Sequence, residues 1–153
     1  MVETIAKRRP DWSFVFVGPV REGLNKPNLT NVHFIGYVPY EVLPGYLAAF
    51  DVCILPFRRD RVTESVNPIK MYEYMATGKP IVSTSIPEVE RYSDLIRIAE
   101  GPEAFEKAIS DALKEDTPQL AKARRAMARE NSWERRVWSI REIVRMRRED
   151  MGI

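Results

Sequence analysis

Short apolar runs of strand length alternate with helical patterns along almost the whole chain, and this alternation constrains the fold more than any other feature. Residues 12–17, WSFVFV, form a nearly continuous apolar run, as expected for a strand that is covered on both faces. Further short runs are predicted as strands at 32–35, 52–55, 80–84 and 95–98. Strands that alternate with helices predict an α/β fold with a mainly parallel sheet flanked by helices.

The helices expected between these strands carry recognisable start and stop signals. Residues 2–9 have the pattern of a helix end that Pro10 stops, and further helices are predicted at 43–50, 103–113 and 118–129. The clearest signal follows a charged loop at 58–66. Asn67 is a good N-cap, Pro68 suits the first helical position, and Gly78 suits the left-handed position after the last turn.

The last helix, at about residues 131–150, is predicted to start near Ser132, with Glu134 in its first turn. Its apolar residues keep helical spacing, which predicts one buried stripe made of Trp133, Val137, Ile140 and Val144. A helix of this length is also able to leave the domain and to pack on a partner.

Composition restricts the class of protein. The chain has 153 residues, 44% hydrophobic and 30% charged, which is typical of one globular domain spanning 1–153. A net charge of +2 argues against a general nucleic-acid binder. The single cysteine, Cys53, lies among apolar neighbours and is expected to be a buried thiol. Because we find neither a signal-peptide pattern nor the ~18 apolar residues of a membrane span, we expect a cytoplasmic protein.

Lys70 is the residue whose position most suggests a ligand. A cation in the first turn of a helix opposes the positive end of the helix dipole, by about 0.3–1 kcal/mol at an exposed site. This position is understandable if the free amides of the helix start bind an anion such as phosphate. The helix also follows a strand, so it starts at the sheet edge where α/β folds bind ligands. The alternative is a solvated lysine, or one paired with Glu73.

The sequence lacks the residues that several other kinds of functional site require. His33 is the sole histidine, which nearly excludes a histidine-based metal site or catalytic triad. The sequence contains neither GxGxxG after a strand nor GxxxxGK, the phosphate loops of dinucleotide and P-loop proteins. It also has no DxD pattern that would hold a metal-bound diphosphate. We therefore expect no metal and no cofactor.

The run NPIKMYEYMATGKPIV at 67–82 resembles the donor-site signature of group 1 glycosyltransferases, most closely the members with an NPxKxYEYxAxGKPVV pattern. PDWSFVFVGPV, NVHFIGYVPYEVLPGYLAAFDVCILPF and ENSWERRV match corresponding stretches in register, so the resemblance covers nearly the whole chain. It implies a Rossmann-like fold, the C-terminal half of the two-domain GT-B architecture, which binds a nucleotide diphosphate sugar such as a UDP sugar. Such hexosyltransferases usually need no metal and retain the anomeric configuration.

The resemblance also implies roles for individual residues. Glu73 matches the second glutamate of the EX7E motif, which holds the ribose hydroxyls. The start of the helix at Asn67, Pro68 and Ile69, together with Lys70, would face the diphosphate, and Lys70 and Glu73 are the candidate catalytic residues. The residues expected to border the nucleobase or the donor cleft are Gly18, Gly36, Tyr37 and Val38.

Two departures from the family pattern matter. The first glutamate of EX7E falls on Ser65, with Glu64 adjacent, so these two residues are candidates for the contact with the donor sugar. In addition, the family's domain opens with a strand that lies between WSFVFV and VCILPF, and the sequence begins after it, without the acceptor-binding N-terminal domain. We therefore expect a chain that does not complete a transfer alone. Either the two flanking strands close up, or a neighbouring chain fills the gap.

Two alternative functions remain. One is a GT-B-type nucleotide-sugar 2-epimerase domain. The other is a non-catalytic association module, in which the basic helices at 122–148 contact an anionic membrane or another protein. A solvated helix face is the plainer interpretation of these basic residues.

Overall fold

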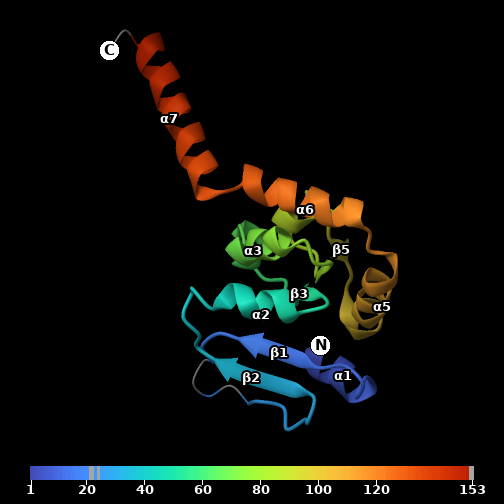
Figure 1. Cartoon of the computed structure of the whole chain (residues 1–153). Coiled ribbons are helices and arrows are strands. Elements are labelled where there is room, and N and C mark those ends of the chain that lie inside the picture. The colour runs from blue at the N-terminus through green and yellow to red at the C-terminus, as the bar shows by residue number, and fades with distance from the viewer. Residues whose placement is uncertain (21–22, 24, 152–153) are drawn as a thin grey trace.

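The structure is a computed structural model that describes residues 1–20, 23 and 25–151. It confirms the predicted α/β class with parallel strands flanked by helices (Figure 1). The strands are β1 (Phe14–Val17), β2 (Val32–Gly36), β3 (Cys53–Leu55), β4 (Ile81–Ser83) and β5 (Arg97–Ile98). The helices are α1 (Val2–Arg8), α2 (Leu43–Ala49), α3 (Ile69–Thr77), α4 (Pro87–Glu90), α5 (Gly101–Glu115), α6 (Pro118–Glu130) and α7 (Trp133–Asp150), and a 3₁₀ turn, η1, spans Thr63–Ser65.

The strands form two separate parallel sheets. One has the order β1-β2 and the other the order β3-β4-β5. In the described residues β1 pairs only with β2, and β3 pairs only with β4. The strands that flank the expected gap have therefore not closed up on each other.

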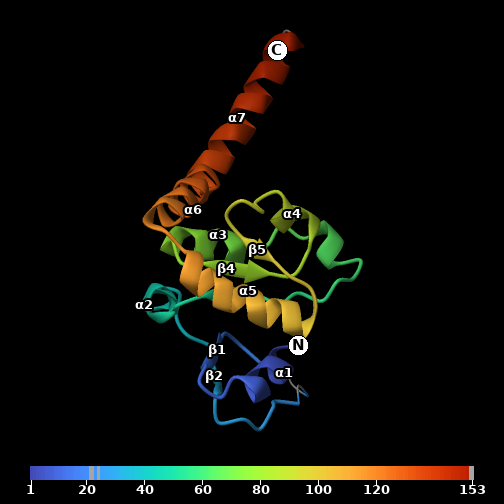
Figure 2. The ribbon, with the colours of Figure 1, turned by 90° about the vertical axis from the view of Figure 1, so that its right-hand side faces the viewer.

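Two apolar clusters lie on opposite faces of the β3-β4-β5 sheet, because side chains alternate between the faces of a strand. Cys53, Leu55 and Ile81 point towards α3 and join its buried Met71 and Met75. Val82, in register between them, belongs to the second cluster with Ile5 of α1, Phe14 of β1, and Phe105 and Ile109 of α5. The three layers are thus α3 with α6, the strands, and α1 with α5 (Figure 2).

Helix α3 is fixed at its C-terminal end. Gly78 follows it with φ 77°, the left-handed conformation that was predicted there. The buried Arg124 of α6 donates from Nε and Nη2 to the Gly78 carbonyl oxygen at 3.1 and 2.9 Å, and Arg125 donates to the Thr77 carbonyl oxygen at 2.9 Å. These cations satisfy carbonyls that the helix leaves free, at the negative end of its dipole.

The prediction that Asn67 caps α3 is wrong. The N-cap is Pro68, whose extended backbone (φ −76°, ψ 109°) delays the helix by one residue, and no side chain among the described residues caps the first turn. Asn67 does not reach back to that turn because its amide donates to Glu88 Oε1 of α4 at 3.3 Å.

The predicted buried stripe of α7 is also wrong. Ser132 caps this helix as expected, since its Oγ accepts from the Arg135 amide at 3.3 Å. However, Trp133 is 66% exposed and Ile140 is 61% exposed, and none of the helix's residues is buried. The reason is that α7 extends away from the body beyond α6 (Figure 1), so no described element covers its stripe. Neither α7 nor any other described helix is both long and apolar enough to cross a membrane.

Candidate functional site

The candidate site is built around the carboxyl ends of β1 and β2. Gly18 follows β1 with φ 135°, and Gly36 ends β2 with φ 81°, backbone conformations that glycine adopts readily. The Gly18 amide donates to the Gly36 carbonyl oxygen at 2.8 Å, so two of the predicted site residues are in direct contact. Tyr37 and Val38 follow immediately, and the Tyr37 side chain is 77% exposed.

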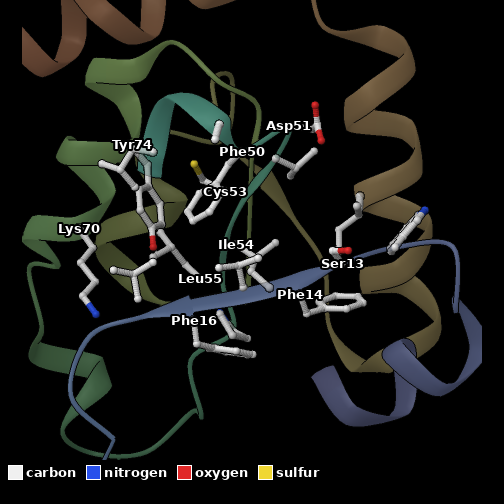
Figure 3. A pocket seen from close by; sticks show the side chains of 18 of the residues that line it. Ser13, Phe14, Phe16, Phe50, Asp51, Cys53, Ile54, Leu55, Lys70 and Tyr74 are labelled. Carbon is white, nitrogen blue, oxygen red and sulfur yellow. The ribbon is translucent and has the colours of Figure 1, made fainter. Parts of the chain in front are cut away.

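Lys70 and Glu73 lie one turn apart on α3 and line the same cavity, together with Val17, Leu55 and Tyr74. Figure 3 shows the Lys70 side chain pointing towards the carboxyl end of β1. Among the described ion pairs, none joins Lys70 to Glu73 or to another carboxylate. The ammonium is therefore not neutralised by the local pairing that was the alternative interpretation.

The first turn of α3 keeps free hydrogen-bond donors. The Met71 amide donates to the Pro68 carbonyl oxygen at 3.0 Å, whereas the amides of Ile69 and Lys70 have no partner among the described bonds. Pro68 is buried, but Ile69 is 55% exposed and Lys70 is exposed as well, so solvent reaches this turn. Two amides at the positive end of a helix, beside an unpaired ammonium, have the chemistry that binds an oxyanion.

The charged loop before α3 is ordered by Asp60. Its Oδ1 accepts from the amides of Val62 and Thr63 at 3.0 and 2.9 Å, and these bonds, the one from Thr63 foremost, lower the pKa of the Asp60 carboxyl. Glu64 and Ser65 lie exposed in the 3₁₀ turn that follows, and neither side chain has a described hydrogen bond. Both remain candidates, although neither is among the described residues that line the cavity with Lys70 and Glu73.

Glu88 of α4 is a polar residue near the site that the sequence did not single out. Its Oε1 accepts from the Tyr72 hydroxyl at 2.8 Å and from Asn67 at 3.3 Å. Burial, with hydrogen bonds to Tyr92 and Glu88, raises the pKa of the Tyr72 hydroxyl. The only signal in the sequence was an acidic residue in the first turn of a short helix. This cluster ties α4 to the start of α3 and uses the Asn67 side chain that the sequence had assigned to the helix cap.

Cys53 and Tyr74 also line the cavity, and both side chains are largely buried. Burial raises the pKa of the Cys53 thiol to about 12, and burial also raises the pKa of the Tyr74 hydroxyl to about 12. Cys53 is 1% exposed, as expected from its apolar context. Both groups are therefore neutral packing residues. Within the described ranges, no cluster of histidine, cysteine or acidic side chains has the form of a metal site.

Two comparisons with known proteins bear on this arrangement. The family model described as "Glycosyl transferases group 1" matches residues 1–115, which include all the strands and the whole candidate site. The chain is also 30% identical, over 146 residues, to the putative teichuronic acid biosynthesis glycosyltransferase TuaH of Bacillus subtilis (strain 168). That alignment covers 87% of this chain and 36% of the relative, so the chain spans about a third of the relative's length.

Proposed function

Because the chain belongs to the group 1 glycosyl transferases, we propose that it binds the nucleotide diphosphate sugar from which an enzyme of this family transfers the sugar. The observation that carries the proposal is the start of α3. There the Lys70 ammonium is in none of the described ion pairs, the amides of Ile69 and Lys70 have no partner among the described hydrogen bonds, and Lys70 lines a cavity. The donor is the substrate, so no further cofactor is needed.

Most of the predicted residues then have a role in binding the donor. The diphosphate lies against the amides of Ile69 and Lys70 and the Lys70 ammonium, where charge-assisted hydrogen bonds are strongest. Glu73, one turn further along the same face, accepts from the ribose hydroxyls. The backbone at Gly36, Tyr37 and Val38 borders the base, and Gly18 lets the chain turn closely beside it. Glu64 or Ser65 contacts the donor sugar from the preceding loop.

The chemical role proposed for this chain is stabilisation of the leaving group. In the transfer, the bond between the anomeric carbon and the diphosphate oxygen breaks, and negative charge develops on the diphosphate. Fixed donors aimed at that charge lower the barrier, because they need no reorganisation during the reaction. Lys70 and the helix start supply compensating positive charge without a metal, and Arg58, Arg59 and Arg61 of the exposed loop are close enough in sequence to add to it. The residues that bind the acceptor come from polypeptide outside this chain, and this chain alone does not complete a transfer.

Titration by calorimetry and NMR with UDP, GDP and inorganic pyrophosphate tests the assignment. Lys70→Ala is expected to weaken binding of all three by about 1–3 kcal/mol, since it removes a charge-assisted bond to the phosphates. Glu73→Gln is expected to weaken UDP or GDP but not pyrophosphate, because it contacts only the ribose.

Lys122→Ala is the matched control, since Lys122 is exposed on α6 and distant in sequence from the site. If neither nucleotide shifts the resonances of Ile69, Lys70 and Glu73 at millimolar concentration, the site is wrongly placed. If Lys122→Ala weakens binding as much as Lys70→Ala, the effect is general electrostatics rather than a specific contact.

A second candidate function, contact with an anionic membrane, is favoured by the surface of α7. Its stripe of Trp133, Val137, Ile140 and Val144 is exposed along its whole length. At 100° per residue, four arginines lie within about 80° of the stripe and four acidic residues lie further round the helix. The arginines are Arg136, Arg141, Arg147 and Arg148, and the acidic residues are Glu134, Glu142, Glu149 and Asp150. Basic side chains beside an apolar stripe are typical of interfacial helices.

Co-sedimentation with vesicles tests this surface. Vesicles that contain anionic lipid are expected to bind the chain more strongly than neutral ones, and binding is expected to fall with added salt. Replacing Ile140 and Val144 by Ser is expected to abolish it. Equal binding to neutral vesicles, or none at all, would rule out the membrane function.

A further inference from the structure

Glu88 has a fixed position beside the first turn of α3. It lies in α4, which follows β4 and therefore begins at the same carboxyl edge of the sheet as α3. Ile86 and Val89, on either side of Glu88, are 2% and 0% exposed and pack in the same apolar cluster as Met71 and Met75 of α3. These buried neighbours hold the backbone of Glu88 against α3, and its side chain is only 15% exposed.

One carboxylate oxygen of Glu88 joins the two ends of that turn. Its Oε1 accepts from the Tyr72 hydroxyl at 2.8 Å and from the Asn67 side-chain amide at 3.3 Å. Asn67 lies two residues before the helix and Tyr72 is its fourth residue, so the two bonds span Ile69 and Lys70. The bonds fix the path of the turn, and the amides of Ile69 and Lys70 keep no partner among the described hydrogen bonds.

The Tyr72 ring is itself held in one place. It is 9% exposed, and the Tyr92 ring packs edge-on against it with the two centroids 6.0 Å apart. The Arg136 guanidinium of α7 lies over the Tyr72 ring, 5.0 Å from its centroid. Because both neighbours restrict the ring, the hydroxyl that reaches Glu88 comes from a defined position, and the bond between them connects two fixed points of α3 and α4.

Both oxygens of Glu88 are engaged within the protein. Oε1 has the two bonds to Tyr72 and Asn67, and Oε2 lies 3.3 Å from Arg91 Nη1. The Arg91 side chain is 72% exposed, so this ion pair contributes little to stability. Glu88 is also not among the described residues that line the cavity with Lys70. Its influence on a ligand therefore passes through the turn that it holds.

We propose that Glu88 is a positioning residue for donor binding, which acts through Asn67 and Tyr72. It holds the first turn of α3 in the conformation that aims the amides of Ile69 and Lys70 at the diphosphate before the ligand arrives. Donors that are already in place lose little freedom on binding, and affinity gains from this. The inference rests on the proposed nucleotide binding. It requires an oxygen that accepts two hydrogen bonds, which a carboxamide supplies as well as a carboxylate does.

The test compares four variants of the 153-residue chain. Glu88→Ala removes the acceptor, Glu88→Gln keeps an acceptor without the charge, and Tyr72→Phe removes one of the two bonds. Tyr92→Phe is the matched control, because its hydroxyl lies 3.2 Å from that of Tyr72 but has no described bond to Glu88. Removing it changes the same cluster and leaves both bonds to Glu88 Oε1 in place.

Two measurements are made on each variant. Amide hydrogen exchange without ligand is followed by NMR at Met71, which donates to Pro68 in the first turn, and at Gly78, which donates to Met75 at the other end of α3. Glu88→Ala is expected to speed exchange at Met71 about tenfold and to leave Gly78 unchanged, because only the first turn loses its support. The second measurement is calorimetric titration with inorganic pyrophosphate and with UDP.

In the titrations, Glu88→Ala is expected to weaken binding of both ligands about fivefold to twentyfold, because small displacements of donor groups cost much of their effect. Tyr72→Phe, which keeps the bond to Asn67, is expected to weaken binding about threefold. Glu88→Gln and Tyr92→Phe are expected to stay within about twofold of the unchanged chain, since both keep the two bonds to Oε1.

Three results in the titrations overturn the proposal. The first is equal affinity in Glu88→Ala and the unchanged chain. The second is a Glu88→Gln variant as weak as Glu88→Ala, which shows that the carboxylate charge matters and not its hydrogen bonds. The third is a loss in Tyr92→Phe equal to that in Tyr72→Phe, which shows that any change in the cluster has the same effect. If Glu88→Ala does not fold, as lost protection at Gly78 would show, Tyr72→Phe and Glu88→Gln decide the matter.

Failure of the proposed function is recognised separately. If the unchanged chain binds neither pyrophosphate nor UDP, the donor site itself is wrongly assigned. The exchange at Met71 needs no ligand, so it still decides whether Glu88 holds the first turn of α3. Equal exchange at Met71 in Glu88→Ala and the unchanged chain overturns that part of the proposal.

Discussion

Replacing Arg124 by methionine tests how the candidate site is held in place. Arg124 is 3% exposed, and its guanidinium joins three structural elements. It donates twice to the Gly78 carbonyl oxygen after α3, once to the Leu95 carbonyl oxygen at 3.5 Å, and pairs with Asp116 after α5. Methionine keeps an unbranched side chain of similar reach but has no charge and no donor, so it removes these bonds without leaving a large void.

The magnitude follows from what the substitution leaves behind. A buried ion pair that loses one partner costs about 3–5 kcal/mol, and an unsatisfied buried carbonyl costs about 1–3 kcal/mol. Because the Asp116 side chain keeps 25% of its exposure, its charge is partly solvated, and we expect a total loss of about 2–4 kcal/mol. This is a large fraction of the about 5–15 kcal/mol that stabilises a typical domain. Urea denaturation measures it directly.

Two further variants make this result specific. Arg125→Met is the matched control, because Arg125 is an exposed neighbour with one bond to the Thr77 carbonyl oxygen, and we expect less than about 1 kcal/mol from it. Adding Asp116→Asn to Arg124→Met is expected to recover part of the loss, since it removes the stranded charge. If Arg124→Met costs no more than Arg125→Met, the buried guanidinium does not fix α3 as described.

Two other substitutable features give clear expectations. Gly78→Ala is expected to destabilise the chain by about 1–2 kcal/mol in urea, because Gly78 has φ 77° and an added Cβ would lie 2.5 Å from Arg125 Cζ; equal stability of the two chains would contradict the left-handed turn. Burial raises the pKa of the Cys53 thiol from 9.0 to about 12, so the neutral form is favoured by folding. The free energy of unfolding is therefore expected to be unaffected by this group below pH 9.0 and to fall as the pH rises towards 12, with Cys53→Ala as the comparison. Rapid alkylation of folded Cys53 by iodoacetamide at pH 8 would contradict its burial.

The fold class and the end of α3 were predictable because they depend on local signals. The alternation of strand-length and helical segments predicted each strand, and Gly78 predicted the end of α3, since left-handed backbone strongly favours glycine. The placement of Lys70 in the first turn of α3 also followed from spacing alone. The spacing did not show whether Lys70 pairs with Glu73, because side-chain rotamers and partners depend on the surrounding structure.

The features that sequence reasoning missed are all set by contacts distant in the chain. Arg124 has the same local context as the exposed arginines of α6, and only its approach to Gly78 and Asp116 makes it buried. The stripe of α7 has the spacing of a buried face, but periodicity shows only which residues share a face and not whether a partner is present. The local sequence around Asn67 predicted a helix cap. It did not reveal the partner that its side-chain amide binds, because Glu88 is 21 residues away.

The unequal fixation of α3 has a consequence for how a ligand is detected. Two arginines hold its last turn, whereas in the described part of the chain the first turn has no side-chain cap and its first two amides have no hydrogen-bond partner. An anion bound there would act as the absent cap, and its effect would spread from the least restrained end of the helix towards the end that is already anchored. Occupancy of this turn would therefore raise the melting temperature of the chain, since ligands that bind only the native state stabilise it in proportion to the logarithm of their concentration.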